Sequence, residues 1–147
     1  MNNNKIVSIT WWDYSSRAER IALALNAELV FIGKIRKKKN LFVSFILYFS
    51  YAYQNIKILR RLKPAIVIIT NTTWAVALVN FVYTKIANIK LVLDSHSCAF
   101  DHEFIKYPLF LSLFFSFYST VSFITNQSHY KLLTENRAKA LILSDIP

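Results

Sequence analysis

Runs of apolar residues recur along the chain and indicate six strands. Within each run Val, Ile and Leu follow one another directly, with little alternation between apolar and polar positions. Such continuous runs are typical of parallel strands that are buried on both faces of a sheet. We therefore predict strands at residues 5–10, 28–32, 65–70, 90–94, 121–125 and 140–143.

Segments of helical character separate these strands. Segment 73–87 starts with Thr, a residue suited to the N-cap position, and segment 108–119 starts with Pro, which is favoured in a first helical turn. The regular alternation of strand and helix predicts an α/β fold, a Rossmann-like doubly wound parallel sheet with helices on both faces. At 147 residues the chain fits a single domain, 1–147. The predicted helices cover residues 17–26, 41–62, 73–87, 108–119 and 127–136.

One stretch raises the alternative of a membrane span. Residues 107–125 carry no charge over 19 positions, close to the ~20 residues that a transmembrane helix requires. Pro108 lies at the start of this stretch, Ser and Thr punctuate it, and 121–125 has the composition of a strand. We therefore interpret the stretch as a helix followed by a strand of the sheet.

Composition narrows the classes of function. The formal net charge of +10 favours anionic partners, namely nucleic acid, lipid head groups or phosphorylated ligands. The chain has no recognised nucleic-acid-binding motif and its basic cluster adjoins an apolar helix, so we expect no nucleic-acid partner. Its single cysteine, Cys98, excludes an internal disulfide framework and a Cys-based zinc site, and we expect no metal site. Gly33, the sole glycine, excludes a glycine-rich phosphate loop.

Polar and aromatic residues follow several of the predicted strands. Trp12 and Arg17 come after the first strand, Asn71 after the third, and the stretch 94–97 (Asp-Ser-His-Ser) at the end of the fourth. The carboxyl ends of parallel strands meet at one edge of a sheet, where ligands of such folds bind. The sequence therefore predicts a ligand site at this edge.

Four stretches of the chain carry a resemblance to a known family. They are Trp12 followed by Arg17 at the opening of a helix, the Leu-Lys-Pro-Ala entry at 62–65, the Asp-Ser-His-Ser block at 94–97, and the closing segment 125–147. Together they resemble the N-terminal half of a GT-B glycosyltransferase of the family-4 type, over nearly the whole chain. The chain departs from that pattern after the first strand, where many members have glycine and this sequence has Trp and Tyr.

The resemblance implies that this chain is the acceptor-side half of such an enzyme. The C-terminal donor-binding domain has no counterpart in the sequence, so the resemblance implies a missing domain or partner subunit and little or no activity of the chain alone. It implies a nucleotide-sugar donor in the complete enzyme and no cofactor within this chain. We expect transfer of a sugar to a lipid-linked or polysaccharide acceptor, by a cytoplasmic protein at the inner face of the plasma membrane.

His96 and Asp94 are the predicted catalytic residues. A neutral imidazole can orient the acceptor hydroxyl and accept its proton, and Asp94 can fix the imidazole tautomer. The alternative is that Asp94 caps a turn and His96 bonds to backbone groups.

The acceptor and phosphate contacts are assigned to Trp12, Arg17, Asn71 and Ser97. Arg17 at a helix start suits a phosphate, and the alternative is that Arg17 pairs with Asp13 or Glu19 on the surface. The tryptophans of this region either stack on a sugar or pack in the core.

A basic cluster precedes the long aromatic helix predicted at 41–62. Cations that meet lipid head groups and aromatics that enter the acyl boundary are typical of proteins at an anionic membrane surface. The alternative is a solvated turn followed by a core helix. The residues assigned to this surface are Arg36, Lys37, Lys38, Lys39, Phe42 and Phe45.

Two non-enzymatic interpretations stay open. The chain can be a basic α/β module that docks on membranes or recruits a partner subunit, or the remnant of a truncated gene. Binding to anionic vesicles would support membrane docking for the enzyme and the module alike, whereas absence of sugar transfer with every donor-binding partner would favour the non-enzymatic module.

Overall fold

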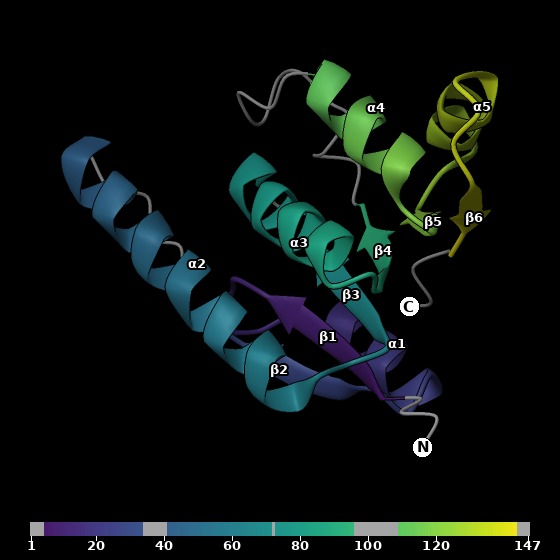
Figure 1. Cartoon of the computed structure of the whole chain (residues 1–147). Helices are drawn as coiled ribbons and strands as arrows, with labels where there is room; N and C mark the ends of the chain where they lie inside the picture. Colours follow the sequence, from purple (N-terminus) through teal and green to yellow (C-terminus); the bar gives the residue numbers. More distant parts are fainter. Residues whose placement is uncertain (1–4, 34–40, 72, 96–108, 144–147) are drawn as a thin grey trace.

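A computed structural model of the chain describes residues 5–33, 41–71, 73–95 and 109–143, with residues 41–44 described by their backbone alone (Figure 1). The described residues form a six-stranded, all-parallel sheet flanked by helices, which confirms the predicted α/β, Rossmann-like fold. The strands are β1 (Ile6–Thr10), β2 (Glu28–Phe31), β3 (Ile66–Thr70), β4 (Lys90–Asp94), β5 (Val121–Ile124) and β6 (Ala140–Ile142). The helices are α1 (Ser16–Ala24), α2 (Leu41–Leu62), α3 (Trp74–Ile86), α4 (Leu109–Tyr118) and α5 (Gln127–Glu135).

The strand order explains which face each helix covers. The order is β2-β1-β3-β4-β5-β6, so the step from β1 to β2 runs in the opposite direction to all later steps. Crossovers between parallel strands are right-handed in nearly all proteins, so a change of direction moves the connecting helix to the other face. Accordingly α1 lies on one face of the sheet and α2 to α5 lie on the other (Figure 1).

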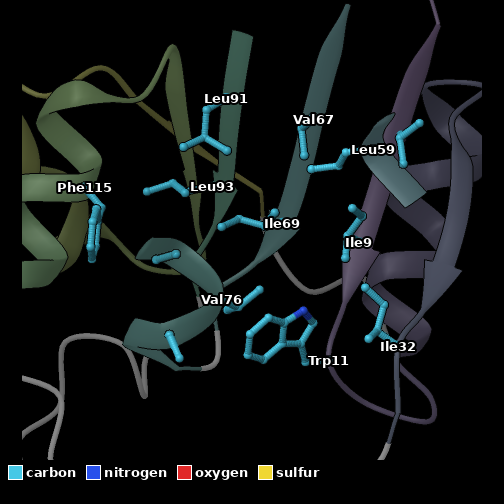
Figure 2. Packing of buried hydrophobic residues seen from close by; sticks show 13 residues of the cluster. Ile9, Trp11, Ile32, Leu59, Val67, Ile69, Val76, Leu91, Leu93 and Phe115 are labelled. Atoms are coloured by element: carbon cyan, nitrogen blue, oxygen red, sulfur yellow. The ribbon is translucent and has the colours of Figure 1, made fainter. Parts of the chain in front are cut away.

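Each face of the sheet has its own apolar cluster. Ile69 and Leu93 point toward the four-helix face and pack with Leu59 of α2 and Phe115 of α4 (Figure 2). Successive strand residues point to opposite faces. The residues between them therefore face α1, where Ile68, Val92 and Phe123 pack with Ile21. Both faces are buried, which is why the strands are continuously apolar in sequence.

The helices end without glycine. After α1, α3 and α5 the backbone enters the left-handed region at Asn26, Asn88 and Arg137, with φ of 49°, 53° and 60°. At Asn26, the N–H donates to the carbonyl of Leu23, and the next N–H donates to the carbonyl of Ala22. This pattern closes a helix by satisfying its last carbonyl groups. The chain then turns directly into the next strand.

The uncharged stretch 107–125 contains α4 and β5, in agreement with the predicted helix and strand. Within the described parts of the chain, no helix combines the length and apolar character needed to cross a membrane.

Candidate functional site

The strand order reverses between β1 and β3, which are neighbours in the sheet while their connections lead away in opposite directions. In open α/β sheets this reversal opens a crevice at the carboxyl ends of the strands, and ligands bind there. The residues at this position are Thr10 and Trp11 at the end of β1, and Thr70 and Asn71 at the end of β3. Asp94 pairs with Thr70 in the sheet register, so the end of β4 lies beside the end of β3 at this edge of the sheet.

Arg17 and Asp94 form a buried ion pair at this edge. The Ser15 hydroxyl accepts a hydrogen bond from the Ala18 N–H at 3.2 Å and fixes the start of α1, which places Arg17 in the first helical turn. Arg17 Nε donates to Asp94 Oδ1 at 2.8 Å, and the side chains are 10% and 1% exposed. Arg17 Nη1 donates to the carbonyl of Leu143 at 3.0 Å. Arg17 therefore connects α1, β4 and the residue after β6.

The ion pair with Asp94 adds a contact that neither interpretation of Arg17 from the sequence included. The sequence suggested either a phosphate contact or a pairing with Asp13 or Glu19 on the surface. The side chain is mostly buried, and it donates hydrogen bonds to Asp94 and to the carbonyl of Leu143. Taking two charges out of water costs on the order of several kcal/mol per ion. Such a pair therefore persists only where its geometry and further hydrogen bonds offset that cost.

A second polar cluster holds the chain where β4 ends. The Asn71 N–H donates to the Asp94 carbonyl at 2.8 Å, and the Ser95 N–H donates to the Phe123 carbonyl at 2.8 Å. Asn71 Nδ2 also donates to Ser95 Oγ at 3.1 Å, and both residues are fully buried. Asp94 faces α1, so the alternation along the strand turns Ser95 toward the four-helix face. The backbone is therefore fixed on both sides up to the residue that precedes His96.

The structure brings together three of the predicted site residues, Arg17, Asp94 and Asn71, at one edge of the sheet. His96 and Ser97 lie outside the described residues, as do Arg36, Lys37, Lys38 and Lys39. Phe42 belongs to α2, but its side chain also lies outside the described parts.

The tryptophans divide between core and surface. Trp11 is fully buried, and its Nε1 donates to Asn55 Oδ1 at 3.1 Å, so Trp11 packs in the core. Trp12, the next residue, is 39% exposed at the carboxyl edge, and Trp74 at the start of α3 is 45% exposed. Trp11 continues the alternation of Val7 and Ile9 toward the four-helix face, a period of two that sequence analysis could have used.

Sequence analysis missed Thr10, and it included Ser95 only as part of the 94–97 stretch without giving it a role. Thr10 is fully buried at the carboxyl end of β1, and its hydroxyl has no hydrogen-bond partner among the described residues. Buried hydroxyl groups normally have a partner, so this one is a candidate contact for a ligand in the crevice. Both residues could have been found as polar positions at the ends of otherwise apolar strands.

The exposed end of α2 carries aromatic side chains. Phe45 is 62% exposed and its ring centre lies 4.8 Å from that of Phe49, which is 63% exposed. On the inner side of the same helix, burial raises the pKa of the Tyr48 hydroxyl, and the neighbouring Tyr51 adds to this shift. The helix therefore has a core side and an aromatic surface side, and contact of that surface with a membrane stays a prediction.

A polar pocket of about 340 Å³ lies at the opposite, amino edge of the sheet. Lys85 and Lys90 line it together with Tyr118 and Thr120. The Lys85 ammonium lies 5.5 Å from the centre of the Tyr118 ring, within the range of a cation–π contact. Helices α3 and α4 both end here, and the negative ends of helix dipoles oppose a bound anion. The two lysines therefore do not make this pocket at the amino edge a better anion site than the carboxyl edge.

Among the described residues, no three His, Cys, Asp or Glu side chains gather closely enough to hold a metal ion. Comparison of the chain with protein-family models, with curated proteins and with solved structures finds no match.

Proposed function

We propose that the chain is the acceptor-side half of a glycosyltransferase that uses a nucleotide-sugar donor held by a separate domain or subunit. The observation that carries this proposal is the buried Arg17–Asp94 pair at the carboxyl edge of the sheet, beside the reversal of strand order. In folds of this type the ligand lies at that edge. We take the retention of a charged pair that is costly to bury as support for a site beside it.

His96 is the proposed catalytic base. Its imidazole accepts the proton of the acceptor hydroxyl as the hydroxyl oxygen attacks the anomeric carbon, and the nucleoside diphosphate leaves with the bonding electrons. Asp94 and Ser95, which are fixed by neighbouring strands, set the position from which residue 96 starts. Arg17 acts in this proposal by holding Asp94, because its guanidinium is bound within the protein.

The acceptor is proposed to lie along the crevice. Trp12, partly exposed, offers a ring face to a sugar, and the buried Thr10 hydroxyl offers a hydrogen bond. Asn71 is proposed to support the crevice through Ser95, and Ser97 to contact the acceptor.

Sugar transfer tests the proposal in membranes that contain the natural partners. Membranes from source cells lacking this gene are supplemented with purified protein and radiolabelled nucleotide sugars, and label is measured in lipid and polysaccharide fractions. We expect wild type to restore incorporation and His96→Ala to lower it by about 100-fold, the typical contribution of a general base. Lys139→Gln, an exposed change between α5 and β6, is the matched control. Equal restoration by wild type and His96→Ala rules out the assigned base, and no incorporation with wild type rules out the enzyme.

A second candidate function is docking on an anionic membrane surface, with or without catalysis. The exposed aromatics Phe45 and Phe49 of α2 favour it, together with the absence of acidic residues from that helix. The proposal includes a peripheral position at the inner face of the plasma membrane, with Arg36, Lys37, Lys38 and Lys39 near the head groups. Flotation with anionic vesicles tests this function, and loss of flotation is expected when Lys37, Lys38 and Lys39 are changed to Glu.

A further inference from the structure

A groove of about 440 Å³ runs between α2 and α3 on the outer side of the helical layer. This volume lies within the range of about 300–1,000 Å³ that is typical of small-molecule sites. The walls are apolar, with Ile56 on α2 and Leu78, Val82 and Ile86 on α3, and Arg60 is the charged residue among the lining side chains of the groove. An apolar channel with one cationic group suits an amphiphile that has an apolar chain and an anionic head.

The groove continues into exposed apolar surface on both helices. On α3, Leu78, Val82 and Ile86 are 41%, 45% and 82% exposed, and their spacing of four residues places them on one side of the helix. On α2, Phe45 and Phe49 precede Ile56 and Arg60 along the same side. The aromatic end of α2 and the groove therefore lie on the same side of that helix.

The charges on these helices indicate which partner can cover the apolar surface of α2 and α3. Helices α2, α3 and α4 contain no acidic residue, whereas Lys57, Arg60 and Arg61 of α2 and Lys85 of α3 lie toward their carboxyl ends. A second copy of the chain would bring like charges together across the contact. An anionic lipid surface instead supplies both the apolar chains and the negative charge.

We propose that the groove between α2 and α3 takes an acyl chain of an anionic phospholipid, with Arg60 at the phosphate. This inference rests on the proposed membrane docking and deepens it, because it assigns the docking face to the α2–α3 side and adds a specific chain-binding groove to non-specific surface contact. In this proposal the bound phospholipid anchors the protein, and the protein meets the acyl region through side chains of α2 and α3 that are exposed in the folded structure.

Flotation with the full chain tests the groove. Vesicles of phosphatidylcholine mixed with phosphatidylglycerol are compared with vesicles of phosphatidylcholine alone. We expect wild type to bind the anionic vesicles preferentially, and Ile86→Glu and Arg60→Glu each to weaken that binding by about tenfold. Two controls are matched: Leu23→Glu changes an apolar residue of α1 that is 84% exposed, against 82% for Ile86, and Lys139→Glu reverses an exposed charge elsewhere. Both controls are expected to bind as wild type does.

A second measurement, quenching of tryptophan fluorescence, tests whether α3 contacts the acyl chains. Trp74 heads the row that continues through Leu78 and Val82, and it is 45% exposed. Phospholipids with brominated acyl chains quench tryptophan only at contact range, so we expect quenching in wild type and much less in Trp74→Phe. Equal quenching in both proteins overturns the assignment of this face.

The outcomes separate the inference from the function on which it rests. If wild type does not float with anionic vesicles, both the membrane docking and the groove assignment are wrong. If wild type floats and Ile86→Glu and Arg60→Glu float equally well, the docking stands and the groove assignment is wrong. A dimer in sedimentation that Ile86→Glu abolishes, without vesicle binding, assigns the groove to a second copy and overturns the inference.

Discussion

The two edges of the sheet each carry an ion pair of the same length. At the carboxyl edge Arg17 Nε lies 2.8 Å from Asp94 Oδ1, and at the amino edge Lys5 Nζ lies 2.8 Å from Glu28 Oε2. The first pair is 10% and 1% exposed, and the second 35% and 42% exposed. Burial therefore distinguishes these pairs where distance does not, and burial decides how much free energy depends on each.

The connections at the two edges differ as well. At the amino edge, helices pass into strands through left-handed residues such as Asn26, Asn88 and Arg137, in tight turns that serve the fold. At the carboxyl edge, the strands pass into segments that hold the Arg17–Asp94 pair and the Asn71–Ser95 hydrogen bond. Function in parallel α/β folds concentrates at the second kind of edge.

The largest expected effect is the loss of the buried pair. Asp94→Ala leaves the Arg17 charge buried without its carboxylate, and we expect the free energy of unfolding to fall by about 3–5 kcal/mol. Glu28→Ala removes the exposed partner at the amino edge and should cost less than about 1 kcal/mol. Denaturation with urea measures both. Equal losses in the two variants would show that burial does not separate the pairs.

A double change sharpens this result. Arg17→Met combined with Asp94→Leu removes both buried charges together, and it should recover much of the stability lost in Asp94→Ala. No recovery in the double variant would assign the loss to packing, not to the uncompensated charge.

A neutral hydrogen-bond network in the core should have an intermediate effect. Asn55 Oδ1 accepts from Trp11 Nε1 at 3.1 Å, and Asn55 Nδ2 donates to Asn80 Oδ1 at 3.0 Å, all in the buried layer between β1, α2 and α3. Asn55→Ala leaves these groups unsatisfied, and we expect a loss of about 1–3 kcal/mol in the free energy of unfolding. Gln54→Ala, an exposed neighbour, is the control and should change stability by less than about 0.5 kcal/mol. A loss no greater than that of the control contradicts the role of the network.

The smallest expected effect lies at the amino edge and has the opposite sign. Arg137 has a φ of 60°, a conformation that side chains disfavour and glycine adopts freely. Arg137→Gly should therefore raise the thermal midpoint, with a gain of up to about 1 kcal/mol in the free energy of unfolding. Lys139→Gly, a nearby exposed change, should not stabilise. A fall in the midpoint of Arg137→Gly would show that the side chain contributes more than the backbone strain costs.

The fold could be predicted because the information is local. The runs at 66–70 and 90–94 are apolar enough to identify buried parallel strands, and the Asn126 cap begins α5 where expected. Predicted strand ends agree with the structure within one residue and helix ends within two. The helix ends at Asn88 and Arg137 carry no glycine, so the usual stop signal was missing there.

The site could be predicted only in part. The residues at the carboxyl edge were identified from their place after strands, but the Arg17–Asp94 contact joins positions 77 apart in sequence. Its prediction needs the strand order and the face on which α1 lies, which no local pattern specifies. The α2–α3 groove was also missed, although the spacing of four between Leu78, Val82 and Ile86 on an acid-free helix was a usable signal.

The most direct test of the account asks which edge binds a sugar phosphate. The chain is labelled with ¹⁵N and titrated with glucose 1-phosphate, and amide shifts are followed by NMR. The account predicts saturable shifts at the carboxyl edge, in the amides of Trp12, Asn71 and Ser95, that Trp12→Ala weakens, because the partly exposed Trp12 ring is the proposed sugar contact. Saturable shifts confined to Lys85 and Lys90 at the amino edge, or no saturable shift at either edge, would contradict it.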